Sequence, residues 1–138
     1  MMAMGRGDLA MHLNDAHVAL VDDDESVRKA VGRLLRVASM DVDVYASGRD
    51  FLNALADHPP DCVVLDMYMP AMNGLEVQAD LATHHPGLPI VFITAHDDAA
   101  AEQRAMAAGA TAFLHKPFTE QQLLAAIALA IGADARAD

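Results

Sequence analysis

Short apolar runs alternate with amphipathic segments along the chain. Four runs are continuously apolar, at residues 18–21, 62–65, 90–93 and 112–114. Runs of this length predict β-strands that other elements cover on both faces of a sheet. The segment 41–45 instead alternates acidic residues with valines, which predicts a fifth strand that meets water at one face or at an edge of the sheet.

Helices are predicted between these strands. Apolar side chains fall on one helical stripe in two segments, at Val27, Val31, Leu34 and Leu35 and at Leu123, Leu124, Ile127 and Ile131. Residues typical of helix ends flank the segments, with Ser47, Asn73 and Thr119 as expected N-caps and Gly109 just after a helix. A strand and a helix, repeated five times, predict right-handed crossovers, a parallel sheet and a doubly wound α/β domain.

The length and the net charge of the chain limit the classes of function that it can have. The chain has 138 residues, which suits one domain, and its 20 acidic against 9 basic residues give a net charge of -11. Such a charge repels phosphate backbones, so we expect no direct binding of nucleic acid. No apolar run approaches the roughly 18 residues that span a membrane.

The beginning of the chain and its single cysteine suggest a compartment. Residues 1–16 lack the continuous apolar centre of a secretory signal and are expected to form a flexible N-terminal arm. The lone Cys62 lies inside an apolar run, where it has no cysteine with which to form an internal disulfide. Both features favour the cytoplasm, with Cys62 as a core residue.

Polar residues follow the apolar runs directly. Asp22 and Asp23 follow the first run, Asp66 the second, Thr94 the third, and His115 and Lys116 the last. Since ligands of such sheets bind at the carboxyl ends of the strands, these side chains are expected to converge. Two carboxylates about 4 Å apart repel by roughly 4 kcal/mol at an effective dielectric constant near 20. A cation or a proton is therefore required there.

Mg²⁺ meets this requirement because it uses one or two carboxylates together with waters and phosphate oxygens. Lys116 can then bind an oxygen of the same phosphoryl group. Asp66, alone at the end of a central strand, is the best placed carboxylate to act as a phosphoryl acceptor.

Four segments, VDDDESVR, LDMYMPAMNGLE, ITAH and AGATAFLHKPF, resemble in this order the receiver domain of two-component response regulators. The resemblance covers residues 17–131 and leaves 132–138 as an expected frayed tail. It implies a flavodoxin-like (βα)5 fold with strand order 2-1-3-4-5. The segments look most like receivers that precede a helix-turn-helix transcriptional output. Whether the chain acts alone or belongs to a longer regulator is left open.

The resemblance implies a ligand set for Mg²⁺ and a phosphoacceptor. Asp66 resembles the phosphoacceptor, and Asp22 with Asp23 resembles the acidic pair that binds the metal. Asp23 and Asp66 would bind Mg²⁺ directly, and the backbone carbonyl of Tyr68 would complete the ligands that the protein supplies. The remaining acids, Asp24 and Glu25, are expected at the first turn of the next helix, whose dipole favours negative charge.

The resemblance also implies residues that change conformation and residues that tune the reaction. Thr94 resembles the switch hydroxyl that turns toward the phosphoryl group, and Phe113 the aromatic that turns inward with it. Tyr68 and His96 stand at the two positions that tune the survival of the aspartyl phosphate, and we expect their bulk to screen it from water. The Lys116–Pro117 bond is expected to be cis.

The function implied is a signalling switch rather than an enzyme acting on other substrates. A phosphohistidine of a sensor histidine kinase or a phosphotransfer protein would supply the phosphoryl group, and the domain would catalyse its own phosphorylation and dephosphorylation. Output would follow from a shift between two conformations. The expected partner-binding face comprises the fourth helix, the fifth strand and the fifth helix, and a homodimer on phosphorylation is left open.

Two other classes of protein are alternatives to a signalling switch. A haloacid-dehalogenase-like phosphatase would carry a second aspartate two residues after its nucleophile, where this chain has Tyr68. A binding module without phosphorylation would normally lack the acceptor, an acid or the lysine, all of which are present in this chain. Both classes rank below the switch.

Overall fold

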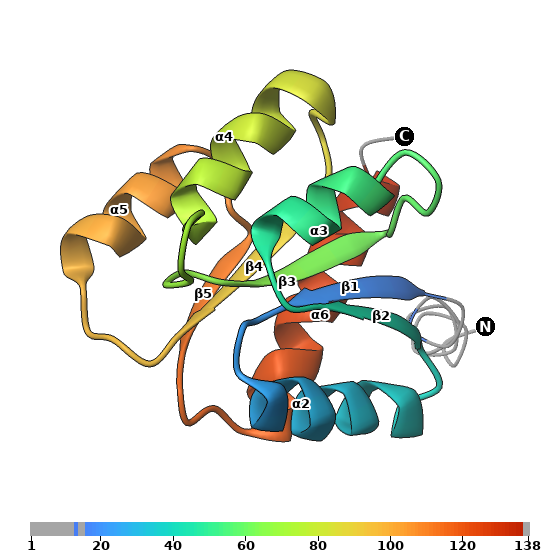
Figure 1. Ribbon diagram of the computed structural model, residues 1–138. Helices are drawn as coiled ribbons and strands as arrows, with labels where there is room; N and C mark the ends of the chain where they lie inside the picture. The colour runs from blue at the N-terminus through green and yellow to red at the C-terminus, as the bar shows by residue number, and fades with distance from the viewer. Residues whose placement is uncertain (1–12, 14–15, 137–138) are drawn as a thin grey trace.

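Five strands and five helices alternate along the chain in a computed structural model (Figure 1). The structure describes residues 13 and 16–136, with backbone alone for 133–136, and most of the expected arm at 1–16 lies outside these residues. The strands are β1 (His17–Val21), β2 (Asp41–Tyr45), β3 (Cys62–Asp66), β4 (Ile90–Thr94) and β5 (Ala112–His115). The helices are α2 (Glu25–Val37), α3 (Gly48–Ala54), α4 (Gly74–His84), α5 (Ala99–Ala107) and α6 (Glu120–Arg136).

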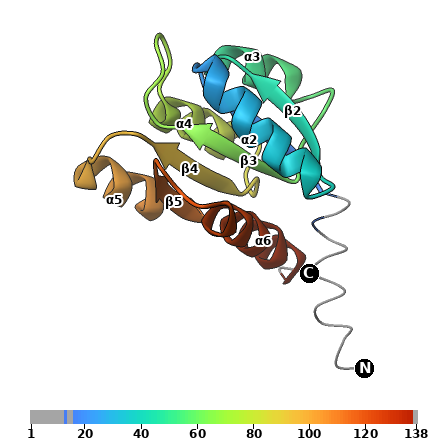
Figure 2. The same ribbon diagram turned by 90° about the horizontal axis from the view of Figure 1, so that it is seen from below.

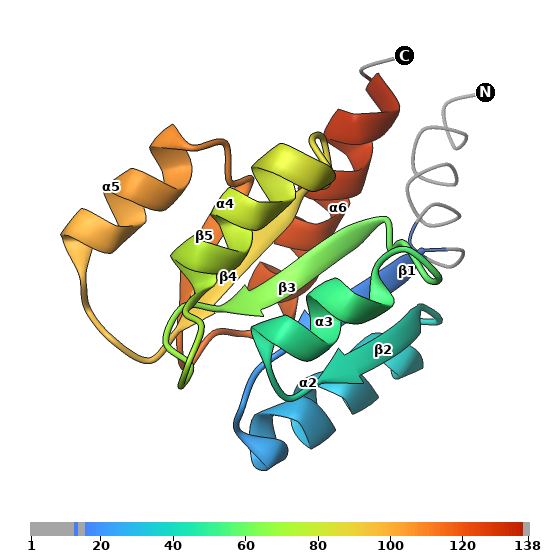
Figure 3. The same ribbon diagram turned by 45° about the horizontal axis from the view of Figure 1, so that its top comes forward.

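The strands form one parallel sheet of order β2-β1-β3-β4-β5. Helices α2 and α6 cover one face of the sheet, in front of the strands in Figure 2. Helices α3, α4 and α5 cover the other face, and α3 and α4 come forward in Figure 3. The expected doubly wound α/β domain, with strand order 2-1-3-4-5, is therefore confirmed.

Each face of the sheet has its own apolar core. Side chains of alternate β1 residues enter different cores. Val18 and Leu20 pack with helices α2 and α6. Ala19 and Val21 pack with helices α3, α4 and α5. Every residue of β3 and β4 is buried. Cys62 belongs to the first core, as expected. None of the helices in the part of the chain that the structure describes is long and apolar enough to cross a membrane.

The two outer strands differ from the central three in their burial. The alternating segment 41–45 forms β2 at one edge, as predicted. The prediction that 112–114 is covered on both faces is confirmed only in part: Ala112 and Leu114 pack against one core and Phe113 against the other, but all three are only partly buried. The reason is topological: β5 is the opposite edge of the sheet, so it has a single neighbouring strand.

Most helix boundaries agree with the predicted caps. The side chains of Ser47 and Asn73 accept backbone N–H groups at the starts of α3 and α4, and Asn73 forms a capping box with Glu76. The Thr119 hydroxyl likewise accepts the N–H of Gln122 in the first turn of α6. Gly109 follows α5 with a φ of 105°, which favours glycine.

The last helix is longer than the sequence indicated. Helix α6 continues to Arg136, so the residues at 132–136 that were expected to be frayed are helical. Two of these five residues, Ala133 and Ala135, are alanines, which have the highest intrinsic helix propensity.

Helix α4 starts in direct contact with the end of β3. The backbone N–H of Gly74 donates to the carbonyl oxygen of Met67 at 2.8 Å. A Cβ atom at Gly74 would lie 2.8 Å from the backbone oxygen of Asp66 and 2.8 Å from Cε1 of Phe92. No side chain fits at this distance, so glycine is what lets α4 begin against the strand that carries Asp66.

We predict that Gly74→Ala destabilises the domain, by about 2 kcal/mol, because backbone must move to admit the methyl group. Gly132→Ala is a matched control, since a Cβ there meets nothing within 4 Å and the position lies inside α6. This control should gain roughly 0.5–1 kcal/mol from helix propensity. Urea unfolding of both variants measures the two changes, and an equal response of the two glycines would contradict the contact described for Gly74.

Candidate functional site

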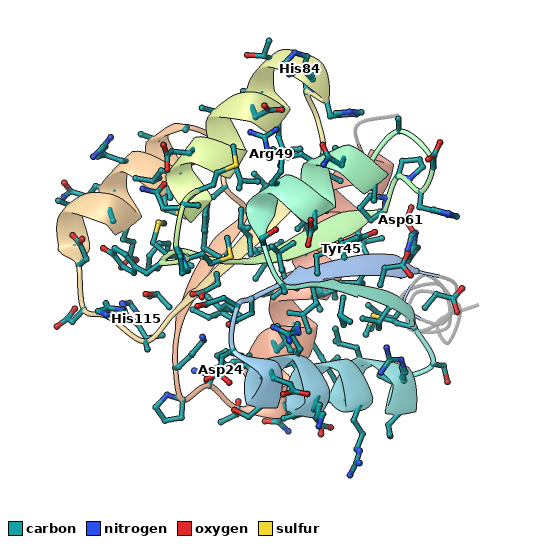
Figure 4. All side chains as sticks on the ribbon, in the orientation of Figure 1. Asp24, Tyr45, Arg49, Asp61, His84 and His115 are labelled. Carbon is teal, nitrogen blue, oxygen red and sulfur yellow. The ribbon has the colours of Figure 1, made fainter. Side chains whose placement is uncertain are left out.

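The carboxyl ends of the strands bring the predicted residues to one edge of the sheet. Asp66 is the last residue of β3 and Thr94 the last of β4, while Asp22 and Lys116 directly follow β1 and β5. Because β1, β3, β4 and β5 are parallel neighbours, residues far apart in sequence meet there. Figure 4 shows the loops of this edge, with Asp24 at the start of α2 and His115 at the end of β5.

Three carboxylates form the centre of the site. Oxygens of Asp22, Asp23 and Asp66 all lie within 4.8 Å of one another. Asp22 is fully buried and Asp66 is 5% exposed, whereas Asp23 is exposed to solvent. Oxygen donors of this kind and number suit a hard divalent cation such as Mg²⁺, which usually keeps several of its waters.

Lys116 brings a positive charge to this cluster. Its ammonium nitrogen lies 2.9 Å from Oδ2 of Asp22 and 3.8 Å from Oδ1 of Asp66. The Lys116–Pro117 peptide bond is cis, as the resemblance implies. When all three carboxylates are ionised, the charges of Lys116 and of the nearby Arg28 guanidinium leave the centre with an excess of negative charge.

Asp22 is held in place from several sides. Its Oδ1 accepts the backbone N–H of Asp24 at 2.9 Å, while its Oδ2 accepts Lys116. The guanidinium of Arg28, on α2, donates to the backbone carbonyl of Asp22 at 2.8 Å. Every polar atom named here has a partner, which is what allows a carboxylate to be fully buried.

Burial and neighbouring charges shift the pKa of the Asp66 carboxyl group. Burial raises the pKa of the Asp66 carboxyl group to about 7, and the nearby Asp22 carboxylate acts in the same direction. The ammonium of Lys116 acts in the opposite direction without cancelling the other two effects. A second cation would favour the ionised carboxylate, which is the form that can act as a nucleophile.

The four consecutive acids separate into two pairs. Asp22 and Asp23 belong to the carboxylate cluster. Asp24 is the N-cap of α2, where its side chain accepts the N–H and the hydroxyl of Ser26, and these bonds lower the pKa of Asp24. Glu25 lies in the first turn of α2 and pairs with Lys29 at 3.3 Å. The predicted placement of Asp24 and Glu25 at the first turn of the following helix is confirmed, while metal binding by Asp22 and Asp23 stays a prediction.

The two predicted switch residues lie on neighbouring strands. Thr94 is fully buried, and its hydroxyl accepts the backbone N–H of His96 at 3.0 Å. Phe113 is half-buried and stands opposite Phe92 in the β4–β5 register, with the two ring centroids 5.8 Å apart. The structure thus brings Thr94 to the site and places Phe113 two residues before the end of β5.

The two predicted tuning residues form a pair. The rings of Tyr68 and His96 lie with their centroids 4.6 Å apart. The hydroxyl of Tyr68 donates a hydrogen bond to Asp98, which raises the pKa of Tyr68 and lowers that of Asp98. Asp98 is also the N-cap of α5.

Sequence reasoning missed three residues around the site. Asp98 stands three residues before Ala101, whose N–H it accepts, so the ordinary preference for aspartate at N-caps could have found it. Gly74 follows the predicted cap Asn73, but its tight contact with β3 carries no sequence signal. The bond from Arg28 to the Asp22 carbonyl is equally invisible in the sequence.

Residues 18–128 match the family model of the response regulator receiver domain. The chain belongs to this family. Receiver domains are the signalling switches of two-component systems, and phosphotransfer to an aspartate is the general function of the family. They interact with histidine kinases and generally bind Mg²⁺ in an acidic pocket, and this receiver has an aspartate cluster of that kind.

Several relatives support the assignment of this receiver. Nodulation protein W of Bradyrhizobium diazoefficiens is 37% identical over 130 residues, which cover 94% of this chain and 57% of that protein. Response regulator protein TmoT of Ectopseudomonas mendocina is 39% identical over 122 residues, covering 87% and 56%. The chain thus spans a little over half the length of these relatives.

The fold of this receiver is also that of solved receiver structures. The crystal structure of a response regulator receiver domain protein from Clostridium thermocellum has a TM-score of 0.85 at 26% sequence identity. The match covers 89% of this chain and 99% of that one. The (βα)5 flavodoxin-like fold is therefore confirmed both by the sheet order and by comparison.

We predict that Asp66→Asn stabilises the metal-free receiver at neutral pH. Because the folded-state pKa of Asp66 is raised to about 7 from an ordinary 3.8, its stability contribution is present at low pH and is lost as the pH rises toward 7. The asparagine, which stays neutral, avoids that loss. The difference in melting temperature between variant and parent should grow between pH 4 and pH 7 and then level off, as measured with a chelator present.

Asp24→Asn is the control for this experiment. The pKa of Asp24 is lowered, so this group stays ionised over the same range, and asparagine is an equally good N-cap. Its difference from the parent should therefore be flat with pH. An equally flat Asp66→Asn curve would contradict the raised pKa.

Proposed function

We propose that this receiver takes a phosphoryl group onto Asp66 from a phosphohistidine of a sensor histidine kinase or a phosphotransfer protein. The observation that carries the proposal is the meeting of three carboxylates within 4.8 Å beside the ammonium of Lys116. Asp66 is the acceptor because it ends the central strand β3 and lies between the acidic residues after β1 and the lysine after β5.

Mg²⁺ fits the donor set as the metal of this reaction. Carboxylates of Asp23 and Asp66 and the backbone carbonyl of Tyr68 would bind it, and Asp22 would support it from the buried side. When bound, Mg²⁺ offsets the repulsion among the carboxylates and the charge of the incoming phosphoryl group. The protein supplies oxygens alone, as this hard cation prefers.

The residues of the chain perform the transfer in one displacement. A carboxylate oxygen of Asp66 attacks phosphorus, and the bond from phosphorus to the imidazole nitrogen of the donor breaks with its electron pair on nitrogen. Lys116, already 3.8 Å from Asp66, binds a phosphoryl oxygen as a point charge. Hydrolysis by water later returns Asp66 to its free carboxylate, so the domain catalyses both halves of its own cycle.

The switch is proposed to follow from a change of partner for Thr94. Its hydroxyl accepts the His96 N–H in this conformation and would donate to a phosphoryl oxygen in the other. Movement of Thr94 opens space on the β4–β5 side, which Phe113 would enter. The altered face would comprise α5, β5 and α6, the fourth helix, fifth strand and fifth helix in chain order.

The partners and the cellular location of this receiver are proposed from those of its family. Transcriptional regulatory protein TdiR of Thauera aromatica is 40% identical over 118 residues, which cover 52% of that protein. We propose that this receiver likewise controls a transcriptional output in the cytoplasm and contacts nucleic acid only through that output. Pairing of two receivers on phosphorylation is part of this proposal.

We predict that millimolar Mg²⁺ raises the melting temperature of the receiver by a few degrees, since a ligand that binds only the folded state stabilises it. Asp23→Asn should remove most of that rise, because it takes one ligand from the site. Asp24→Asn should leave the rise intact, because Asp24 caps α2 instead. Equal losses in the two variants, measured by thermal melts across a Mg²⁺ series, would exclude Asp23 as a specific ligand.

We predict that incubation with acetyl phosphate and Mg²⁺ adds one phosphoryl group to the receiver, as measured by intact mass. The gain should be absent in Asp66→Asn and in samples that contain a chelator. Lys116→Ala should greatly reduce the gain while Lys29→Ala does not, because Lys29 pairs with Glu25 away from the cluster. A gain that persists in Asp66→Asn would show that another residue accepts the group.

A further inference from the structure

The aromatic pair of Tyr68 and His96 is anchored by a third residue. Tyr68 lies in the loop after β3, two residues beyond Asp66, while His96 and Asp98 lie in the loop after β4. The Tyr68 hydroxyl donates to Oδ2 of Asp98, and its ring packs against His96 at 4.6 Å. The side chain of Tyr68 therefore crosses from one loop of the site to the other and is fixed at its far end.

Asp98 divides its two oxygens between two tasks. Oδ1 accepts the backbone N–H of Ala101 at 3.0 Å and so caps α5, while Oδ2 accepts the tyrosine hydroxyl. The cap fixes the carboxylate in space, so the bond to Tyr68 is made to a positioned acceptor. Tyr68 is still 37% exposed, and an exposed tyrosine without such a bond would be free to change rotamer.

We propose that Asp98 is a positioning residue that holds Tyr68 across the mouth of the site and thereby lengthens the life of the phosphoryl group on Asp66. This inference rests on the proposed function, because it concerns loss of the group that Asp66 accepts. The hydrogen bonds of the Asp98 carboxylate to described residues go to Tyr68 and Ala101 and not to Asp66, so its proposed effect passes through the tyrosine ring.

The step controlled is hydrolysis of the aspartyl phosphate. The oxygen of a water molecule attacks phosphorus, the bond from phosphorus to the Asp66 oxygen breaks, and the carboxylate leaves with the electron pair. The proton lost by the water passes to phosphate or solvent. Water must approach phosphorus on the side opposite the leaving oxygen, so a ring held across the opening between the two loops reduces the productive approaches.

The hydrogen bond supplies this restraint independently of ring size. Tyr68→Phe keeps the ring and its contact with His96 but loses the bond, so the ring can swing away. Asp98→Ser removes the second oxygen but keeps a hydroxyl that caps helices well. Asp98→Asn keeps the cap through its carbonyl oxygen and can donate its amide to the tyrosine oxygen, which restores the bond in the reverse direction.

The test follows loss of the phosphoryl group after acetyl phosphate is removed, by intact mass over time in Mg²⁺. Tyr68→Phe and Asp98→Ser should each lose it roughly fivefold faster than the parent, the factor that one ordinary hydrogen bond supplies. The double variant should be no faster than either single one, because both changes remove the same bond. Asp98→Asn should stay close to the parent.

A matched control is Tyr45→Phe. Tyr45 ends β2 beside Phe51, with ring centroids 5.6 Å apart, and belongs to no part of the proposed mechanism. Its rate should equal that of the parent. Thermal melts of each variant separate a change in rate from a loss of fold.

The possible outcomes distinguish a failure of the role of Asp98 from a failure of the proposed function. Unchanged or slower loss in either single variant, or effects that multiply in the double variant, would overturn the role of Asp98 and leave the proposed function standing. A fast Asp98→Asn would overturn it too, since the rescue would have failed. A parent protein that takes up no phosphoryl group at all would overturn the proposed function and this inference together.

Discussion

Repulsion among Asp22, Asp23 and Asp66 is the interaction on which the site depends. A parallel sheet brings the ends of its strands together, and here that geometry concentrates three carboxylates within 4.8 Å. Lys116 offsets only part of the charge, and burial keeps the pKa of Asp66 high. A centre with this imbalance suits a divalent cation. The proposed binding chemistry would thus follow from an unfavourable arrangement that the rest of the fold is stable enough to maintain.

The fold was predictable because burial leaves a direct trace in sequence. Strands β1, β3 and β4 are covered on both faces, so they appear as continuous apolar runs, while β2 alternates because it is an edge. The burial of β5 was overestimated because Ala112, Phe113 and Leu114 are apolar even though the strand lies at an edge of the sheet. Its partly buried side chains lie on the face that is proposed to bind partners, where apolar residues would suit an interface as well as a core.

The site was predictable only where it coincides with the ends of strands. Asp22, Asp66 and Lys116 follow apolar runs, and the topology alone brings them together. The roles of Gly74 and Asp98 depend on contacts through space instead. The first is set by the distance between two backbone segments and the second by a tyrosine reaching across from another loop. Neither relation has a fixed spacing, so no pattern within a single sequence reports it.

Helices α4 and α5 pack against the sheet in different ways. At Gly74 the helix backbone rests on the end of β3, and further along α4 buries Val77 and Leu81, whose branched side chains interlock with the sheet. Helix α5 buries Ala101 and Ala105, and methyl groups offer little to interlock. Sliding α5 over the sheet therefore breaks fewer contacts than sliding α4. The same fold thus places a helix packed by large branched side chains against β3 and a helix packed by alanines farther along the sheet, where a displacement would cost fewer contacts.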